Sequence, residues 1–543
     1  MISSPSLSEP REQRLVAPRV DGAIVSQPDL SRAVELARSN SQRLDAAPIH
    51  IGGRPLDEFR EWTRTECLRS ARDWIQRELG IDPPSTASGG LIFLTGHQPQ
   101  LNHAGVWMKN VAVARLADAS GGISLNLIVD NDLAGPPVVR VPAGTREEPR
   151  FEDIPFDITQ ATCPWEELHL QDRDLFASFS TRIRNAMAEW GIEPALTEFW
   201  PRAVELSQRC TSISSLLSQC RIAQEQSWGI RNLELPISQL CRTDPFLTFV
   251  AHLALNVRQF YSDYNDAVHE YRKQYRVRNH RHPVPDLGRH DDLYELPFWY
   301  WEAGDRDRKG VYARPLSDGV ELVAGGQLLA RLSSGDDLQS LRDLQNKGRL
   351  RPRALTNTLF ARICFGDLFI HGIGGARYDE ITNRIIETFF GLPVPEFVTL
   401  TATLFLPLAP YSVSQEDVSR LKNEIRRLRF SGPDDESAPD ALADQIRRSE
   451  LLTAAARDRA AGYSRRERRN RQGEARRRHR ELVRIREHLA QFAAAEIAEK
   501  EEQLKIAQQQ LRANTVLASR EFAACLSPAE SLQQLVDSLS RKI

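Results

Sequence analysis

Three clusters of polar side chains each follow a short apolar run, and their residue types suit the binding and activation of a small polar molecule. Histidines and carboxylates transfer protons near neutral pH, amides orient substrates by hydrogen bonds, and lysine or arginine holds anionic groups. The first cluster follows the run LIFL and comprises Thr95, Gly96, His97, Gln98, Asn102 and His103, with Lys109 in the next helix. The other two comprise Asp130, Asn131 and Asp132 in VDND, and His371, Gly374, Gly375 and Arg377 in HGIGGAR.

Each cluster also has a purely structural interpretation, which the sequence leaves open. His97 and Gln98 are equally able to cap the backbone N–H groups at the start of the following helix. The VDND residues precede Leu-Ala-Gly-Pro-Pro and are typical of a turn. Lys109 is either solvated or placed to reach an anion. The HGIGGAR segment suits anion binding by backbone N–H groups and Arg377 at a helix N-terminus, but it matches neither GxGxxG nor a Walker loop.

Two strand–helix–strand units are expected to position these clusters. The first has an apolar strand at 91–94, a helix over about 104–119 and a second apolar run, ISLNLIVDND. The second covers 366–404, with a helix expected from Asp379 to Gly391. Because such units form parallel strands joined by right-handed crossovers, we expect a doubly wound α/β sheet. Ligands bind beyond the carboxyl ends of the strands in such sheets, so the three clusters are expected to converge there.

The rest of the chain predicts insertions into this sheet and a helical tail. The predicted organisation is a poorly ordered Ser/Pro-rich lead-in over residues 1–50, the first part of the core over 51–160, a mainly helical insertion over 161–285, a small β-rich region over 286–345, the second part of the core over 346–412 and a C-terminal antiparallel helical coiled coil over 413–543.

The tail is rich in Arg, Glu, Ala, Gln and Leu, and a long helix is expected over about 441–512. Apolar residues recur at heptad spacing with one slip, at Leu482, Leu489, Ile497, Leu504 and Leu511. This pattern predicts an antiparallel hairpin or coiled coil that buries an apolar stripe, and a partner subunit of a homodimer is the natural candidate to cover it. The run SRRERRNRQGEARRRHRELVR is interleaved with acidic residues and lacks aromatic positions, which favours a solvated helix face over nucleic-acid binding.

Whole-chain composition argues against several classes of function. The 543 residues carry a formal charge of -2, so there is no general attraction to nucleic acid or to an anionic membrane. The seven cysteines are scattered and form no CxxC pair, as expected for reduced thiols. No stretch approaches the roughly 20 apolar residues of a membrane span, and no secretory signal is recognisable, so we expect a cytoplasmic protein. The histidines of NHRHP, with His290 and Asp291, match no standard zinc spacing, so no metal is expected.

The stretch LTGHQPQLNHAGVWMKNVAVARLA resembles the Thr-Gly-Gln-Gln signature of the bacillithiol biosynthesis cysteine-adding enzymes, in which a strand, this loop and a lysine-bearing helix follow one another. Later features come in the family's order: an acidic cluster, an ELPF segment, a Leu-Arg-Pro-Arg run ending at Arg353, a Gly-rich loop with Tyr378, and a helical tail. The similarity spans roughly residues 55 to 520. It implies a Rossmann-like core with inserted connective regions and a coiled coil that makes a homodimer.

The resemblance further implies a ligase-like activity that adds L-cysteine to a glucosamine-malate conjugate through an amide bond. Position by position, the residues that match the family's motifs are Thr95, Gly96, Gln98 and Lys109 in the first, Asp130 and Asp132 in the acidic cluster, and Arg353, Gly374, Gly375 and Tyr378 in the late one. His97 stands where the family has glutamine, and VDND replaces a Glu-Asp-His-Asp run.

Amide formation requires a base to deprotonate the amine and donors to stabilise the negative charge that develops on the carbonyl oxygen. His97 or Asp132 is the expected base, with Gln98 grouped beside them, and Lys109, Arg377 and the Gly374–Gly375 loop are expected to hold anionic groups. The cofactor stays open: a nucleotide is one option, although no ATP-binding motif is recognised. Two other hypotheses stand beside this one, a noncatalytic scaffold and an enzyme of the same fold acting on another small polar substrate.

Overall fold

The computed structural model describes residues 15–85, 89–279, 284–305, 307–333, 338–432 and 439–543. The chain divides into two compact units, and each is described by itself. Unit 1 comprises Met1–Val141, Glu152–Leu406 and Arg520–Ile543, and unit 2 comprises Pro142–Phe151 and Pro407–Ser519.

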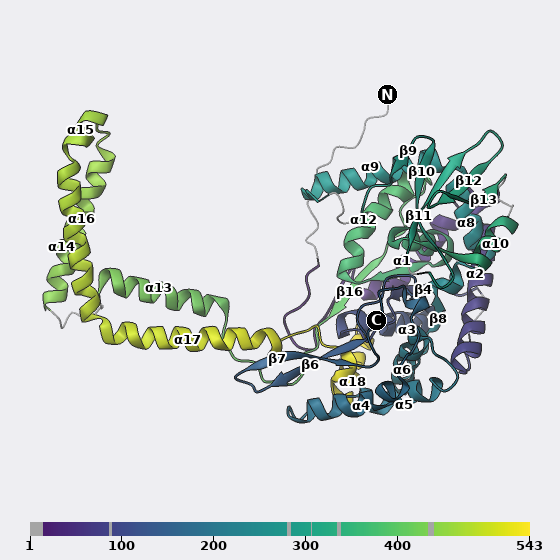
Figure 1. Ribbon diagram of the computed structural model, residues 1–543, viewed down its shortest axis with the longest axis horizontal. Coiled ribbons are helices and arrows are strands. Elements are labelled where there is room, and N and C mark those ends of the chain that lie inside the picture. The colour runs from purple at the N-terminus through teal and green to yellow at the C-terminus, as the bar shows by residue number, and fades with distance from the viewer. Residues whose placement is uncertain (1–14, 86–88, 280–283, 306, 334–337, 433–438) are drawn as a thin grey trace. The chain divides into compact units, whose positions relative to one another are not determined.

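The centre of unit 1 is a six-stranded sheet in the order β1-β16-β15-β4-β5-β8 (Figure 1). Its strands are β1 (Ile24–Gln27), β4 (Ile92–His97), β5 (Ile123–Ile128), β8 (Leu233–Pro236), β15 (Leu368–His371) and β16 (Val398–Ala402). All neighbours are parallel except the edge strand β1. Every residue of β5 is buried, as expected for a parallel strand covered on both faces. The order of the strands along the chain reverses between β4 and β15. The prediction of a mixed α/β fold with a parallel sheet is therefore confirmed.

The helices of unit 1 cover this sheet and form the long insertions between its strands. They are α1 (Ala33–Asp45), α2 (Leu56–Trp74), α3 (Ala104–Ser120), α4 (Arg173–Ala188), α5 (Leu196–Leu206), α6 (Ile213–Ser227), α7 (Ile237–Leu240), α8 (Asp244–Leu255), α9 (Val257–Tyr275), α10 (Gln339–Lys347), α11 (Ala354–Phe360), α12 (Ile373–Thr388) and α18 (Ala529–Ser540). Helix α3 packs on β4, β5, β15 and β16, and α2 packs on β8. Because α3 crosses the middle of the sheet, even its polar residues Lys109 and Asn110 are buried.

A second, antiparallel sheet lies in unit 1 after α9, and Figure 1 shows its strands gathered together. Its strands are β9 (Arg289–His290), β10 (Leu293–Glu302), β11 (Lys309–Pro315), β12 (Val320–Ala324), β13 (Gln327–Leu332) and β14 (Gly348–Pro352). Two short hairpins complete the strands: β2 (His50–Ile51) with β3 (Arg54–Pro55), and β6 (Val138–Gly144) with β7 (Pro149–Pro155).

The predicted disorder of residues 1–50 is wrong for much of this segment. Residues 1–14 lie outside the described residues, but β1 pairs with β16 and α1 buries its apolar face, including Leu36 and Leu44. Asn40 of α1 donates hydrogen bonds to the carbonyl oxygens of Asp367 (2.9 Å) and Glu396 (2.8 Å). The partners that order this segment lie more than 300 positions away in the sequence, so its own composition did not reveal them.

Two element boundaries near the predicted clusters differ from expectation. Strand β4 continues to His97, three residues beyond the expected end, because Gly96 and His97 still pair with Leu127 and Ile128 of β5. Helix α12 begins at Ile373, not at Asp379, and Gly372 precedes it without a capping side chain. The residues expected in a Gly-rich loop therefore form the first turns of a helix.

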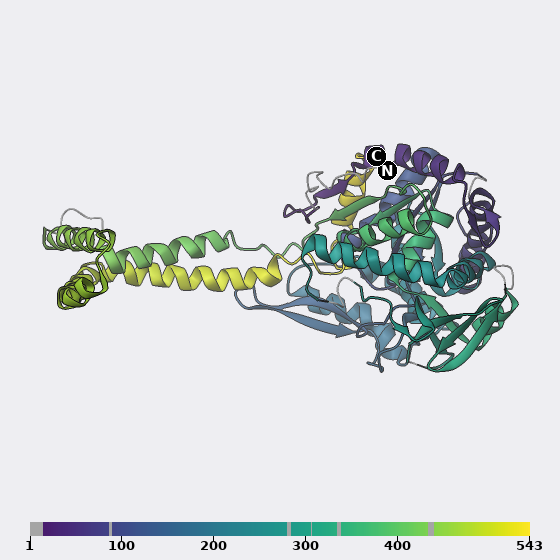
Figure 2. The same ribbon diagram turned by 90° about the horizontal axis from the view of Figure 1, so that it is seen from above.

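Unit 2 is mainly helical. Its helices are α13 (Gln415–Ser431), α14 (Pro439–Ala460), α15 (Arg465–Asn470), α16 (Gln472–Phe492) and α17 (Ala494–Leu517). Figures 1 and 2 both show α13 alongside α17 and α14 alongside α16. The single long helix expected over 441–512 is thus wrong: the chain turns at Gly462, which has the positive φ of 59° that favours glycine, and α14 and α16 run back along each other.

The predicted apolar stripe of unit 2 is covered within the same chain. One cluster joins Leu428 of α13 to Ile497 of α17, with Leu504 packed against it. A second joins Leu451 of α14 to Leu489 of α16, with Leu482 packed against it. Residues 520–543, which were expected to belong to the tail, lie in unit 1, where α18 packs on α3. The stripe therefore does not by itself require a partner subunit.

Among the described residues, no helix combines the length and apolarity that crossing a membrane requires. All seven cysteines are buried free thiols. The same residues contain no group of three or more His, Cys, Asp or Glu side chains able to hold a metal ion. His280 and His282 of the NHRHP motif lie outside the described residues, and His290 and Asp291 are exposed.

Candidate functional site

A cavity of about 540 Å³ opens in unit 1 at the carboxyl ends of β4 and β15, where the strand order reverses. It brings the first and third predicted clusters together. The predicted residues that line it are Gly96, His97, Gln98, Asn102, His103, Lys109, His371, Gly374, Gly375 and Arg377. The two clusters meet because β4 and β15 pair as parallel neighbours, so both strands end at the same edge of the sheet. Thr95 of β4 lies opposite Ile370 of β15 and donates a hydrogen bond to its carbonyl oxygen (3.0 Å).

His97 is held as a neutral side chain in the cavity wall. Its ring nitrogens lie within hydrogen-bond distance of Asn110 Oδ1 (3.0 Å), Gln98 O (3.0 Å) and Asn102 Nδ2 (3.2 Å). Desolvation, together with the positive charge of Lys109, lowers the pKa of His97 to about 3. An imidazole with both nitrogens engaged and so low a pKa is a poor proton acceptor at neutral pH. The geometry therefore argues against His97 as the base and fits a role in shaping the wall.

Lys109 presents a buried positive charge to the cavity. It is only 5% exposed, and its Nζ donates to the carbonyl oxygen of Gly96 at 2.8 Å. Desolvation lowers the pKa of Lys109 to about 8. Among the described residues no carboxylate forms an ion pair with this ammonium group, which leaves its remaining N–H donors for a ligand. A buried cation without a counter-ion is stabilised when an anionic group binds beside it.

His371 is the best-oriented proton acceptor in the cavity. Its Nε2 lies 2.8 Å from Asp379 Oδ2, and Arg362 Nη1 donates to the same oxygen at 2.5 Å. Burial alone would raise the pKa of Asp379, but the charges of Arg362 and His371 outweigh it and lower that pKa to about 2. Burial lowers the pKa of His371 despite this carboxylate. A neutral imidazole that donates from Nε2 leaves the lone pair of Nδ1 available.

The Nδ1 atom of His371 faces the first turn of α12. A Cβ atom on Gly375 would lie 3.0 Å from it, and Gly374 has open space where its side chain would be. Because Gly372 provides no capping side chain, the first N–H groups of this 16-residue helix are left for a ligand. A helix N-terminus favours an anion, and Arg377 lines the same cavity.

His103 and Asn102 line the cavity but also have structural roles. His103 precedes α3, and its Nδ1 accepts a hydrogen bond from Gly105 N at 3.1 Å, so it caps the helix. The capping interpretation thus holds for His103 and not for His97 or Gln98. Asn102 donates to His97 and to the carbonyl oxygen of Gln100 (2.9 Å), which fixes the loop between β4 and α3.

The second predicted cluster lies beside the cavity and does not line it. Gln98 Nε2 donates to Asp132 Oδ2 at 2.7 Å, and Arg308 lies 3.6 Å from the other carboxylate oxygen of Asp132. The Asp132 side chain is 51% exposed. Asn131 donates to the carbonyl oxygen of Pro352 (2.8 Å), and Asp130 turns into a separate cavity. These interactions indicate that Asp132 positions the Gln98 side chain and does not act as a base.

Two residues carried over from the family resemblance also lie outside the cavity wall. Arg353 forms an ion pair with Glu295 and stacks on Trp299, with its guanidinium carbon 4.0 Å from the ring centre. Tyr378 is half-buried one turn into α12. Both were assigned by order along the chain, which does not determine the direction of a side chain.

Several wall residues were not predicted: some lie between the predicted residues of the same two segments, and others come from distant parts of the chain. They are Leu15, Val16, Ala17, Gln100, Gly105, Val106, Gly372, Ile373, Thr401, Arg520 and Glu521. Arg520 Nη2 donates to Thr401 Oγ1 and to the carbonyl oxygen of Ala402, both at 3.0 Å. A Cβ atom on Gly105 would lie 2.6 Å from Thr401 Oγ1, so this close approach requires glycine. Asp379 and Arg362 were missed too, because His371 ends β15 and Asp379 lies in α12, so no periodicity within one element links them.

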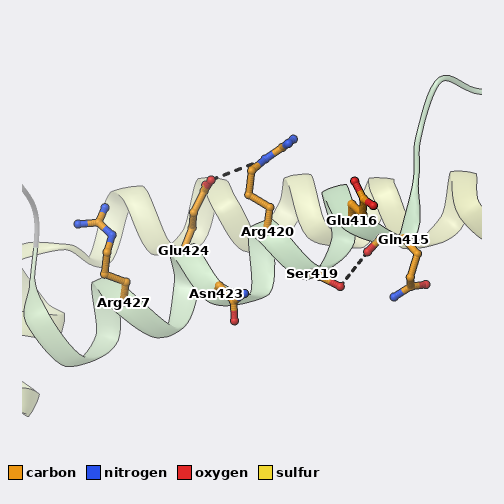
Figure 3. A pocket seen from close by; sticks show the side chains of 7 residues that line it. All are labelled: Gln415, Glu416, Ser419, Arg420, Asn423, Glu424 and Arg427. Carbon is orange, nitrogen blue, oxygen red and sulfur yellow. Dashed lines mark hydrogen bonds and ion pairs between the residues drawn. The ribbon is translucent and has the colours of Figure 1, made fainter.

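A hollow of similar volume, about 570 Å³, lies on α13 in unit 2. All of its lining residues come from this one helix, as Figure 3 shows, and they point outward. Arg420 pairs with Glu424 at 3.9 Å, and Ser419 Oγ donates to the carbonyl oxygen of Gln415 at 2.8 Å. A single polar helix face cannot enclose a ligand, so we take the cavity between β4 and β15 as the candidate site.

The sequence matches no protein-family model and no curated protein. The functional argument therefore depends on the geometry of this cavity.

Proposed function

We propose that this chain is an enzyme that forms a carbon–nitrogen bond, adding L-cysteine to an amino-sugar acceptor of the glucosamine-malate type as an amide. The observation that carries the proposal is the pairing, in one cavity, of an oriented neutral histidine, His371, with donors for anionic groups. The resemblance of the β4–α3 segment to the cysteine-adding enzymes supplies the substrate class. The strand order, with a ligand cavity where it reverses, supports a Rossmann-like doubly wound sheet.

In the proposed reaction, the acceptor amine attacks the activated carboxyl carbon of cysteine. His371 Nδ1 takes the proton from the amine, and the Asp379 carboxylate stabilises the imidazolium that forms. The carbonyl oxygen gains negative charge in the tetrahedral intermediate, and the N–H groups at the start of α12 stabilise it. The carboxyl of cysteine would enter as an acyl phosphate or acyl adenylate formed from a nucleoside triphosphate. The bond from the leaving oxygen to the carbonyl carbon breaks, phosphate or AMP leaves with the electron pair, the His371 imidazolium gives up its proton to solvent or to that group, and the amide remains.

Lys109 and Arg377 are proposed to hold the carboxylates of a malate-like group. Lys109 has no carboxylate partner among the described residues, and a dicarboxylate offers two negative charges to these two cations. The half-buried Gln98, fixed by Asp132, is placed to donate to a hydroxyl or a carboxylate. The wall combines these polar groups with apolar side chains such as Val106 and Ile373, and a sugar ring has both hydroxyl groups and C–H faces to contact them.

An enzyme of the same fold acting on another small anionic substrate is the second candidate. It is favoured by His97, which stands where the resembled family has glutamine and which lines the cavity as a neutral, fully engaged side chain. A noncatalytic scaffold is less well supported, because it gives no reason for a buried histidine–aspartate pair at the cavity.

We also propose that unit 2 is a coiled coil that makes a homodimer. Its internal clusters leave apolar side chains on the outside, at Phe430, Leu442, Ile446, Leu452, Val483, Phe492 and Ile506. Exposed apolar residues gathered on one small helical unit are a common mark of a protein–protein interface.

The activity is tested by incubating the full-length protein with L-cysteine and glucosaminyl malate, with and without ATP, and by mass spectrometry of the product. A mass equal to the sum of the two substrates less one water is expected, and His371→Gln should abolish it. Lys347→Met, at an exposed lysine of α10, is the matched control and should leave the yield unchanged. If the wild-type protein yields no amide but binds malate in calorimetry, the second candidate replaces the first.

A further inference from the structure

A second cavity, of about 330 Å³, lies in unit 1 at the carboxyl ends of β5 and β8. Asp130, two residues beyond β5, and Ser238, in the short helix after β8, are in its wall. Two positions further on, Asp132 is bonded to Gln98 of the first cavity. The polar segment after β5 therefore contributes to two separate places.

The carboxylates in the wall of the second cavity already have partners. Glu166 accepts two hydrogen bonds from Arg351, at 2.8 and 2.7 Å. Glu78 accepts from Ser215 Oγ at 3.0 Å. Asp130 accepts from the backbone N–H of Ser238 at 2.9 Å and from its hydroxyl at 2.5 Å. Glu166 is thus paired with arginine, whereas Glu78 and Asp130 are held by neutral donors; the wall also contains four arginines, Arg77, Arg242, Arg349 and Arg351, against these three carboxylates.

Several donors in the same wall have no partner. Ser214, the second residue of the 15-residue helix α6, is 4% exposed, and within the described residues neither its hydroxyl nor its backbone N–H makes a hydrogen bond. Arg77 and Arg242 are exposed residues that also line the cavity. Arg77 Nε donates to the carbonyl oxygen of Asp73 (3.2 Å), and neither arginine forms an ion pair with a carboxylate of the described residues. Desolvation and the nearby charges of Arg351 and Arg349 lower the pKa of Arg242, as expected for a guanidinium that lacks a counter-ion.

We propose that this cavity binds an oxyanion, the phosphate or carboxylate group of a small polar molecule, between Ser214, Arg77 and Arg242. The N-terminus of α6 and the hydroxyl of Ser214 supply adjacent donors, and the two guanidinium groups supply charge. The cavity is larger than a single phosphate group, so the ligand carries further atoms, and Gln239 and Trp74 line the space for them. This site is independent of the function proposed for the first cavity.

The proposal is tested by calorimetric titration of the full-length protein at low salt with inorganic phosphate, glucose 6-phosphate and malate. At least one of the three should bind, and Arg242→Gln should weaken that binding by about tenfold or more, the usual effect of losing a charge-assisted hydrogen bond. Ser214→Ala, which removes only the hydroxyl, should weaken it several-fold. The comparison uses only those compounds whose binding Arg242→Gln weakens. Among them, tighter binding of the phosphates than of malate assigns the ligand to the phosphate class, and the reverse assigns it to the carboxylates.

Two controls separate this site from the first cavity. Arg258→Gln, at an exposed arginine of α9, should leave the affinity unchanged. Lys109→Met should leave the affinity for inorganic phosphate and for glucose 6-phosphate unchanged, because Lys109 lines only the first cavity. Malate is left out of this comparison, because the first cavity is itself proposed to bind it. The proposal is overturned if the wild-type protein binds none of the three compounds, or if binding survives Ser214→Ala and Arg242→Gln but is lost in Lys109→Met. Circular dichroism shows whether Ser214→Ala and Arg242→Gln retain the fold. Arg77→Gln, at an exposed residue of the wall, should also weaken binding.

Discussion

Lys109→Met is expected to stabilise the unliganded protein while weakening its binding of anions. Burial lowers the pKa of Lys109 from 10.5 to about 8, and at 1.36 kcal/mol per pH unit this difference corresponds to about 3 kcal/mol of destabilisation at neutral pH. The variant removes that cost but loses the charged hydrogen bond to Gly96, which contributes roughly 1.5 to 3 kcal/mol. The net change is an increase of about 1 kcal/mol in the free energy of unfolding.

The pH dependence of unfolding tests independently whether the charge on Lys109 destabilises the folded protein. Between pH 8 and 10.5 the unfolded chain retains a proton on Lys109 that the folded protein has lost, so the stability contributed by this residue rises with pH across that window. The stability of the wild-type protein relative to Lys109→Met should therefore rise by about 3 kcal/mol between pH 8 and pH 10.5, from about 1 kcal/mol below the variant to about 2 kcal/mol above it.

Urea unfolding at pH 7 and pH 10 measures the stability term, and calorimetric titration with malate measures binding. The affinity should fall by roughly 10- to 100-fold in Lys109→Met, since a charge-assisted contact in a desolvated cavity is lost. Lys347→Met serves as the surface control in both assays. A variant that loses more than about 1.5 kcal/mol of stability, with unchanged affinity for malate, would show that Lys109 is a structural residue and would refute the reasoning.

The other predictions concern the proposed base, its anchor, the second cavity and unit 2. His371→Gln should lower kcat by roughly 10²- to 10⁴-fold with little change in KM, and an equal loss of substrate affinity would contradict its role as a base. Asp379→Asn, which leaves a buried guanidinium without its counter-ion, should lower the free energy of unfolding by about 3 kcal/mol in urea titrations. Burial raises the pKa of Asp130 to about 7, so the folded state binds the extra proton between pH 3.8 and 7 and stability falls as pH rises through that window. The stability of Asp130→Asn relative to wild type should therefore improve by about 2 kcal/mol between pH 5 and pH 8. Ile446→Glu should convert a dimer to a monomer in sedimentation, whereas Leu328→Glu, at an equally exposed apolar residue of unit 1, should not; a monomeric wild-type protein would rule out the dimer.

The expected strands and helices around the site agree with the structure where hydrophobic periodicity is strong. The run at 91–94 and ISLNLI form neighbouring parallel strands, and the helix between them begins and ends within a residue of expectation. Such patterns are local, because a buried strand or helix must carry its own apolar residues. The convergence of Gln98 and Gly375 on one cavity followed from the general rule about the carboxyl ends of parallel strands.

The sequence did not predict in which direction individual side chains point or which distant residues pair. Asp130 and Asp132 lie two positions apart in one motif, yet one enters the second cavity and the other accepts a hydrogen bond from Gln98. The alternation of an extended strand would put both on one side, but the chain turns at residues 130–132, directly after β5. The pairing of His371 with Asp379 depends on α12 beginning at Ile373. The low helix propensity of Gly374 and Gly375 argues against a helix start at that point. Tertiary packing outweighs that propensity, since only glycine leaves room beside His371.

The amino-acid order by itself determined the strands β4 and β5, the helix α3 between them, and the polar groups at the ends of those strands, because strong apolar patterns are encoded in a few neighbouring residues. Only the tertiary structure decided that Arg520, which follows the helices of unit 2 along the chain, lines the cavity beside Thr401. It also decided that His371, and not His97, keeps one ring nitrogen without a hydrogen-bond partner among the described residues. Hydrogen-bond partners and desolvation set these roles. The partners of Arg520 lie 118 and 119 positions away, and those of His97 and His371 lie within 13 positions but on other elements, so in each case the packing of the elements decides the contact.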